Sequence, residues 1–313
     1  MFAKKNLEQL FEEFMYESEF VRKVRKETIR GYANTFFLFR RLMPNISLSN
    51  LNANSIIEFF KILQERERVV GKGIRKIGIK KSTIASYWSK LHCFFEWLKT
   101  NNHLKTDPFD NLPYPTPNYD DRKFLRKEEV EKIMTAIHIH HDNNILLLKR
   151  NLTLFHLLLF CGLRKEELMS LQVRDIDFER NCLTVRGDTS KSGKSRQLPL
   201  HSSLVMYLKD YLQERKKYNT PFLVVSSKQD EKLSIDGLKH LVQKIRYHSG
   251  ISFHVHQFRH TFAVNFLKSS NNIAKLKQLL GHKSISMTLI YLRCLPTDEL
   301  RGDIESMSID KLI

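Results

Sequence analysis

Apolar side chains recur at intervals of three and four residues through the first part of this chain, the spacing that lines one face of a helix. The clearest run is Ile84, Tyr87, Trp88, Leu91, Phe94, Phe95 and Leu98. Ser82 precedes this run and is placed to cap the start of a helix. Further runs occur at Leu7–Phe14 and at Thr28–Leu42. The pattern predicts an all-helical domain over residues 1–110.

A basic stretch interrupts this helical pattern between Arg66 and Lys81. Its cations and glycines are Arg66, Arg68, Lys72, Arg75, Lys76, Lys80 and Lys81 with Gly71, Gly73 and Gly78. Glycines among cations predict an exposed loop that can approach a phosphate backbone closely. A run of solvated charges without a partner is the other interpretation, and the sequence leaves both open.

The segment Asp107–Arg122 contains four prolines and several aspartates and has little periodicity. This composition is typical of an extended, fairly stiff linker. The sequence therefore predicts a helical domain over 1–110, a linker over 111–123 and a second domain over 124–313.

The second domain is predicted to be mainly α with a small antiparallel sheet. Its expected helices are Lys127–Ile137, Leu146–Phe160, Leu204–Leu212, Ser234–Tyr247, His260–Lys268 and Ile273–Leu280. The second of these is apolar nearly all round from Leu152 onward, so it must be buried. Two short strands, Cys182–Val185 and Gln197–Leu200, flank a polar loop in the pattern of a hairpin.

The charge of the chain indicates the kind of partner. Lysines and arginines number 52 against 34 aspartates and glutamates, which gives a net charge of +18. This excess favours nucleic acid, because each neutralised phosphate releases counterions, although a basic surface for solubility or for anionic lipid is the alternative. No apolar run approaches the ~20 residues of a membrane span, and the four cysteines have no paired spacing. We expect a soluble, cytoplasmic protein.

Several residues of the second domain carry chemistry that suits a phosphodiester. Arg164 follows an apolar run and a glycine that can aim its guanidinium at a pocket, and Glu167 is placed to brace it. His256 and Arg259 are three residues apart, so on a helix they face the same way. Taken singly, an arginine at a helix start is usually a surface cation, and Tyr291 in its apolar stretch reads as a core residue.

The histidines also raise the question of a metal site. His254, His256 and His260 form one group, and residues 138–142 contain three more histidines and an aspartate. Neither group shows a known ligand spacing, and no cysteine pair joins them. The second group is interpreted as the solvated end of a helix.

Three segments resemble, in residue type and order, the catalytic domain of the tyrosine recombinase (phage integrase) family, in a Xer-like form. Cys161–Leu168, which reads Cys-Gly-Leu-Arg-Lys-Glu-Glu-Leu, resembles the family's Thr-Gly-Leu-Arg-x-x-Glu-Leu box. His256–Ala263 resembles the His-x-x-Arg-His box. Leu280–Ser284 with Thr288 and Tyr291 resembles the box that ends in the nucleophile. The N-terminal part is similar in size and pattern to the family's helical core-binding domain.

The resemblance implies a role for each matching residue. Arg164 and Arg259 would hold the non-bridging oxygens of the scissile phosphate. Tyr291 would attack phosphorus to form a 3′-phosphotyrosine link and release a 5′-hydroxyl. His256 would assist proton transfer, and His282 would hydrogen-bond the phosphate. Because the covalent link conserves the phosphodiester energy, neither a metal ion nor another cofactor is implied.

The resemblance also implies a lysine that protonates the leaving oxygen. Many relatives carry a Gly-Lys-Gly-x-x-Lys hairpin, whereas here Gly187 is followed by Lys191 and Lys194. Alignment backward from Arg196 and Pro199 favours Lys191, with Lys194 as the alternative.

The function implied is site-specific recombination of double-stranded DNA through a Holliday junction. Two domains would close as a clamp on duplex DNA, with four protomers acting in pairs, alone or with a related partner recombinase. The biological role would be Xer-like resolution or integration and excision of a mobile element. The tail from Leu295 to Ile313 is expected to dock on a neighbouring protomer. The alternatives are a non-catalytic DNA-binding accessory protein, a type IB topoisomerase and a metal-dependent nuclease.

Overall fold

The protein divides into two compact units, Met1–Asn118 and Tyr119–Ile313. Its structure is a computed structural model that describes residues 5–71, 73–116, 124–141, 143–190 and 193–294. Residues 117–123 of the predicted linker and the tail from Leu295 onward therefore lie outside the described residues. None of the helices in these ranges is long and apolar enough to cross a membrane.

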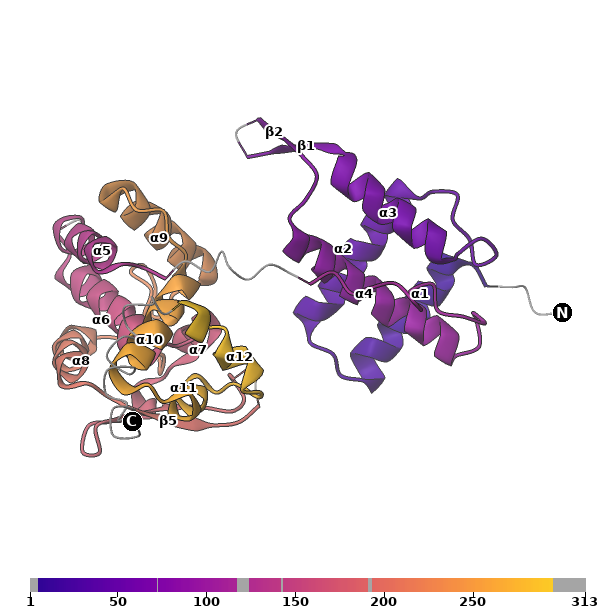
Figure 1. Ribbon diagram of the computed structural model, residues 1–313. Helices are drawn as coiled ribbons and strands as arrows, with labels where there is room; N and C mark the ends of the chain where they lie inside the picture. The colour runs from indigo at the N-terminus through magenta and orange to yellow at the C-terminus, as the bar shows by residue number, and fades with distance from the viewer. Residues whose placement is uncertain (1–4, 72, 117–123, 142, 191–192, 295–313) are drawn as a thin grey trace, which may run out of the picture. The chain divides into compact units, whose positions relative to one another are not determined.

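The N-terminal unit is built mainly from helices (Figure 1), and their buried faces form a core rich in aromatic residues. Its described elements are α1 (Leu7–Tyr16), α2 (Lys26–Leu42), α3 (Ala53–Glu65), β1 (Glu67–Val70), β2 (Ile74–Ile77) and α4 (Lys81–Thr100). The Phe11 and Phe36 rings stack with centroids 3.9 Å apart, and the edge of Phe94 meets both rings. The predicted helical runs are confirmed, because the residues that recur at three and four positions supply this core.

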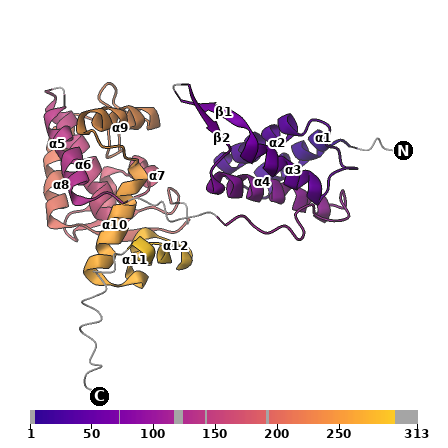
Figure 2. The same cartoon turned by 45° about the horizontal axis from the view of Figure 1, so that its top comes forward.

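The basic stretch is not the loop that the sequence predicted, and the N-terminal unit is not all-helical. Strands β1 and β2 pair antiparallel, with Glu67 opposite Ile77 and Val70 opposite Ile74. Gly71 and Gly73 have positive φ and make the turn, and each strand carries two β-branched residues, a type that favours strands. The hairpin extends beyond the helices of its unit (Figure 2), and every residue of β2 is exposed.

Ser82 does not cap α4. The helix begins at Lys81 with Lys80 as its N-cap, and no side chain accepts a hydrogen bond at this end. The helix therefore begins two residues earlier than the sequence indicated, after the turn through Gly78, and Ser82 lies inside the first turn.

The C-terminal unit packs its helices around one long buried helix. Its described elements are α5 (Lys127–Ile139), α6 (Ile145–Cys161), α7 (Lys165–Ser170), β3 (Ile176–Asp177), β4 (Cys182–Val185), β5 (Arg196–Pro199), α8 (Ser202–Arg215), α9 (Ile235–Ser249), α10 (Val255–Ser270), α11 (Ile273–Leu280) and α12 (Ser286–Leu289). Helix α6 packs against α5, α8 and α10 (Figure 1), which confirms that its apolar second half is buried.

The predicted small antiparallel sheet is confirmed. Its strand order is β3-β4-β5, and Cys182 on β4 lies opposite Pro199 on β5. The expected helices are all present, although α10 begins at Val255, five residues before the expected start. There His254 is the N-cap, and Gln257 completes a capping box. The sheet and α10 carry several of the side chains described next.

Candidate active site

Arg164 is aimed by the turn that ends α6. Gly162 is the C-cap of α6 with φ 56°, in the left-handed region that favours glycine. A Cβ added at Gly162 would overlap the ring of Phe262, so a side chain does not fit there. Arg164 follows as the N-cap of α7, and its side chain is 14% exposed. The glycine thus has the role that its position suggested.

Glu167 is the centre of the charged groups that position Arg164. Its side chain is 0% exposed, and it accepts hydrogen bonds from both the backbone N–H and Nη1 of Arg164, each at 2.9 Å. Arg196 on β5 binds the same carboxylate with two nitrogens, at 2.9 and 2.8 Å. Nη1 of Arg259 lies 3.9 Å from Glu167 Oε2. One buried carboxylate therefore contacts three guanidinium groups.

These contacts keep Glu167 ionised. Burial by itself would raise the pKa of this carboxyl, but the hydrogen bonds and charge of Arg196 outweigh it, helped by the backbone N–H of Arg164 and the charge of Arg259. The net effect lowers the pKa of Glu167 from 4.5 to about 2.

Arg259 is almost completely enclosed, at 1% exposure. Its Nη1 donates to the carbonyl oxygen of Gly162 and its Nη2 to that of Leu280, both at 2.7 Å. It thereby ties the end of α6 to the end of α11. Burial, and next the positive charge of Arg164, lower the pKa of Arg259 from 12.5 to about 10. The group still carries its charge at neutral pH.

His282 follows the glycine that ends α11 and lies against Arg259. Its Nε2 is 3.1 Å from Arg259 Nη2, and its Nδ1 is 2.9 Å from Thr288 Oγ1. Because an arginine nitrogen can only donate, Nε2 must accept, and the proton of the neutral ring lies on Nδ1. Burial and the charge of Arg259 lower the pKa of His282 from 6.5 to about 3, so the ring is neutral at pH 7.

Tyr291 is buried beside these groups, at 3% exposure. Its ring lies parallel to that of His282 with centroids 6.3 Å apart, and 5.5 Å from the ring of His260. Its apolar neighbours belong to α10 and α11 and include Ala263 and Leu280. Tyr291 follows the short helix α12, which covers Ser286–Leu289.

His256 shares a cavity with Arg164. The cavity measures about 560 Å³ and is lined by both residues, by His254 and by one face of α9 that includes Lys239 and Arg246. His256 lies on the first turn of α10 and Arg259 at the start of the second, so the helical segment that their spacing predicted is present.

The structure brings five of the six predicted residues into one region, namely Arg164, His256, Arg259, His282 and Tyr291. The sixth, Lys191, lies outside the described residues. Lys194 is described, exposed and in the loop that joins β4 to β5.

Two contributors were given no role in the site from the sequence. Arg196 binds Glu167, and its Nε also donates to the Leu279 carbonyl at 2.8 Å. Thr288 holds His282. A signal for Arg196 was present, because it lies two residues before the buried Leu198 and so faces inward from its strand. For Thr288 the signal was its place in the box that ends in Tyr291.

Two of the histidines considered as metal ligands lie at a solvated helix end. His138 and His140 are exposed at the end of α5, as the sequence suggested. Within the described ranges, no three His, Cys, Asp or Glu side chains are grouped so that they could hold a metal ion.

Residues 123–297 match the phage integrase family. Tyrosine recombinase XerA of Pyrococcus horikoshii is 31% identical over 290 residues, which cover 92% of this chain and 90% of the relative. The Tn1549 transposon integrase in complex with transposon right end DNA has a TM-score of 0.75 and 18% identity, covering 96% of this chain and 98% of that one. XerH site-specific recombinase in its post-cleavage complex with palindromic difH substrate has a TM-score of 0.69 and 20% identity, covering 95% and 83%. These structural likenesses show the fold.

Proposed function

The chain belongs to the phage integrase family and is a tyrosine-type site-specific recombinase, and we propose that Tyr291 is its nucleophile. The observation that supports this choice is the position of Tyr291 beside His282, which contacts Arg259. A phenol, an imidazole and a phosphate-binding guanidinium of one chain thus lie together, so a single protomer contains these groups of the site.

The reaction follows from the chemistry of the phenol. Tyr291 Oη loses its proton, with His256 proposed to assist that transfer, and attacks the scissile phosphorus. The bond from phosphorus to the 5′ oxygen breaks as the phosphotyrosine bond to the 3′ side forms. The leaving 5′ oxygen takes a proton, which we assign to Lys191. Attack by another 5′-hydroxyl on the phosphotyrosine reverses the step and releases Tyr291. Each bond broken is replaced by one of the same type, so no external energy source is needed.

Arg164 and Arg259 are proposed to hold the phosphate. An arginine offers five N–H donors in a planar fork that matches phosphate oxygens, and it keeps its charge throughout. Arg164 donates to Glu167 from the guanidinium only through Nη1, which leaves Nε and Nη2 for a phosphate. Arg259 is fixed by two carbonyls and cannot swing away. Two preorganised cations would stabilise charge as it develops on phosphorus.

The two histidines are proposed to act on protons and on the phosphate. His282 is neutral with an acceptor at Nε2, so it would contact the phosphate as a donor only after its proton moves or its ring is protonated. A bound phosphate favours that change, because a nearby negative charge raises the pKa of an imidazole. His256 lines the cavity with Arg164 and is proposed to assist proton transfer.

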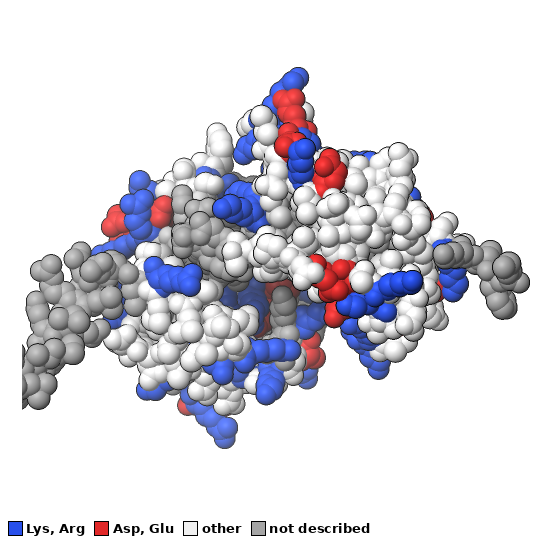
Figure 3. All heavy atoms as spheres, turned by 45° about the vertical axis from the view of Figure 1, so that its right-hand side comes forward, with Lys and Arg blue, Asp and Glu red and all other residues white. Residues whose placement is uncertain are grey.

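We propose double-stranded DNA recombination sites as the substrate, with four protomers acting through a Holliday junction. The net charge of +18 and the Lys and Arg side chains spread over the faces visible in Figure 3 suit a polyanionic partner. XerH and the Tn1549 integrase are seen bound to DNA. The residues after Tyr291 are proposed to dock on a neighbouring protomer.

The test of the proposal is a covalent adduct. Duplexes with a randomised sequence would first be selected for binding, and those recovered would be nicked at successive positions so that a cleaved strand cannot rejoin. Wild type should form a protein–DNA adduct that survives denaturation, and Tyr291→Phe should form none. Tyr211→Phe is the matched control, because Tyr211 is also buried but its hydroxyl donates to the Leu223 carbonyl.

Equal adduct formation by Tyr291→Phe would contradict the proposal. An adduct with relaxation of supercoils but without recombinant products would instead indicate a type IB topoisomerase.

A further inference from the structure

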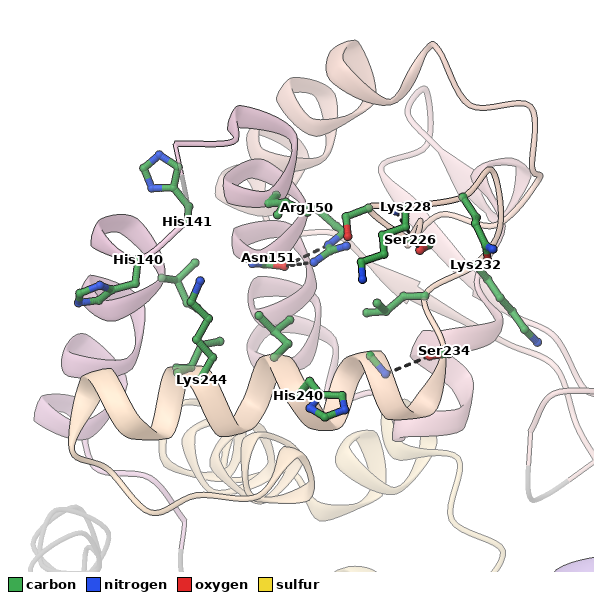
Figure 4. A pocket seen from close by; sticks show the side chains of 18 of the residues that line it. His140, His141, Arg150, Asn151, Ser226, Lys228, Lys232, Ser234, His240 and Lys244 are labelled. Atoms are coloured by element: carbon green, nitrogen blue, oxygen red, sulfur yellow. Dashed lines mark hydrogen bonds between the residues drawn. The ribbon is translucent and has the colours of Figure 1, made fainter.

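A second cavity lies on the other side of α9 from the active-site cavity. It measures about 490 Å³ and is enclosed by α5, α6, α9 and the segment Ser226–Ser234 (Figure 4). Its lining includes Arg150, Asn151, Lys228 and Lys244. The volume is within the range of small-ligand sites, and none of the residues proposed for catalysis lines it.

Arg150 is the most unusual residue of this lining. It is 5% exposed, and its Nε and Nη2 donate to Asn151 Oδ1 while its Nη1 donates to the Val225 carbonyl. Both acceptor groups are neutral. Among the described residues no carboxylate forms an ion pair with Arg150. These bonds use three of the five N–H groups of the guanidinium.

A buried cation without a counter-charge is energetically unfavourable. Transfer of a charge from water to the protein interior is costly unless an opposite charge compensates it. Burial lowers the pKa of Arg150 for the same reason, because it disfavours the charged form of the guanidinium. Arg259 and Arg196 differ, because both lie near the carboxylate of Glu167. Arg215 is also buried and donates only to backbone carbonyls, but it does not line this cavity. An anion in the cavity would supply a counter-charge for Arg150.

The cavity presents further positive charge around Arg150. Figure 4 shows Lys228 extending down from its loop and Lys244 extending up from α9, both into the space near Arg150 and Asn151. Lys232 lies at the rim, with its Nζ over the ring of Phe222. Glu231 is the one acidic residue in the described lining.

We infer that this cavity is a binding site for a phosphate-bearing anion, with Arg150 as its anchor and Lys228 and Lys244 as flanking contacts. Arginine and lysine together suit phosphate, because the fork of the first fixes the orientation and the second adds charge. The phosphate could belong to a free polyphosphate or nucleotide, or to the backbone of bound DNA. This site is additional to the proposed active site and does not depend on it.

Calorimetric titration of the full chain with inorganic tripolyphosphate tests the inference. Wild type should bind one equivalent. Lys228→Ala/Lys244→Ala should weaken the affinity by at least about tenfold, the factor that 1.4 kcal/mol represents. The control Lys209→Ala/Lys216→Ala removes the same charge from exposed positions on α8 and its C-terminal end. It should lower the affinity much less. No saturable binding, or equal loss in the two double variants, would overturn the site.

Asn151→Asp tests the anchor itself. The substitution keeps the shape of the side chain and gives Arg150 an internal counter-charge, so tripolyphosphate should bind about tenfold more weakly without a loss of thermal stability. If this variant binds tripolyphosphate as wild type does, Arg150 is not the anchor and the inference is wrong.

A competition experiment separates the two sources of phosphate. Duplex DNA is added to saturation before the tripolyphosphate titration. If the cavity takes a backbone phosphate, tripolyphosphate no longer binds, and Lys228→Ala/Lys244→Ala binds DNA more weakly than its control. If it takes a free compound, tripolyphosphate still binds and the two double variants bind DNA alike.

Discussion

At the centre of the N-terminal unit, phenylalanine rings pack against one another, with Phe11 and Phe36 stacked 3.9 Å apart and Phe94 edge-on to both. At the centre of the proposed active site, the buried carboxylate of Glu167 is surrounded by guanidinium groups. Arg196 donates a hydrogen bond to each of its two oxygens. The first centre is stabilised by removal of apolar surface from water. The second balances desolvation of charges against their mutual attraction.

This difference has consequences for how each unit tolerates change. An aromatic core loses stability in proportion to the atoms removed and keeps its geometry otherwise. A buried ionic cluster depends on every member, because removal of one partner leaves the others with uncompensated charge. The C-terminal unit has this arrangement where Arg164 and Arg259 must be held still. We therefore expect charge removal to affect function most, and apolar truncation to affect folding.

The largest effect is expected from Glu167→Gln. The amide cannot balance three guanidiniums, so Arg164 loses its fixed position, and strand cleavage should fall by about 100-fold, as for misplacement of a reacting group. Stability should fall by about 3 kcal/mol, which matches the lowering of the Glu167 pKa from 4.5 to about 2. Adduct formation on the nicked duplex measures cleavage, and chemical denaturation measures the free energy of unfolding.

Glu166→Gln is the matched control, because this neighbouring carboxylate is exposed. Its cleavage rate should stay near that of wild type. Both tryptophans of the chain, Trp88 and Trp97, lie in the N-terminal unit, so their fluorescence should show the same unfolding transition in either variant. Equal cleavage by the two variants would show that the ionic cluster does not position the site.

The aromatic centre was largely predictable from sequence. Ile84, Leu91, Phe94 and Leu98 repeat with helical period because a helix that buries one face needs apolar residues at those positions. The hairpin of the same unit was not, because its strands are only four residues long, β2 is exposed throughout and no residue of β1 is fully buried. Short elements without a buried face leave little trace in the hydrophobic pattern.

The ionic centre could be predicted only in part. The spacing of Arg164 and Glu167 places them on one turn, and that pair forms. The contacts of Arg196 with Glu167 and with the Leu279 carbonyl join segments 29 and 83 residues apart, and no local pattern encodes them. Each charged residue taken alone resembles a surface residue, so only the folded chain shows that they are buried together.

The aromatic centre is tested by Phe95→Ala. The Phe95 ring is fully enclosed and contacts Phe39, Phe94 and Phe109. Its truncation should cost about 3–5 kcal/mol. The tryptophan transition in denaturant should move to a lower midpoint while the unfolding of the C-terminal unit, followed by circular dichroism, stays in place.

Phe37→Ala serves as its control, because Phe37 is 76% exposed on the same helix as Phe39 and should change stability by less than about 0.5 kcal/mol. Similar losses in both variants would mean that the aromatic rings do not form the stabilising centre.

A smaller effect is expected from the pH dependence of the C-terminal unit. The His282 pKa is about 3 in the folded chain against an ordinary value of 6.5, so below pH 6.5 the unfolded chain takes up a proton that the folded chain does not. The contribution of His282 to the free energy of unfolding is fully present above pH 6.5 and is lost as the pH falls toward 3. At pH 5 the loss should be about 2 kcal/mol.

His282→Gln removes this titration and keeps an acceptor for Arg259, so its unfolding midpoint should fall less between pH 7 and pH 5 than that of wild type. The midpoint is that of the C-terminal unit, which has no tryptophan, so its unfolding is followed by circular dichroism. Parallel pH profiles of the two proteins would show that His282 titrates normally and that the charges around it are better screened than the structure implies.

The smallest effect tests whether the N-terminal unit depends on polar contacts at all. Asn52 caps α3, since its side chain accepts from the Ser55 N–H while the Ser55 hydroxyl accepts from the Asn52 N–H. Asn52→Ala should cost about 1 kcal/mol, the usual value of an N-cap. Asn54→Ala, two residues on, should be neutral or slightly stabilising, because Asn54 is exposed and alanine favours a helix. A loss at Asn52 as large as that from Phe95→Ala would end the contrast, because a single exposed polar contact would then matter as much to this unit as a buried ring.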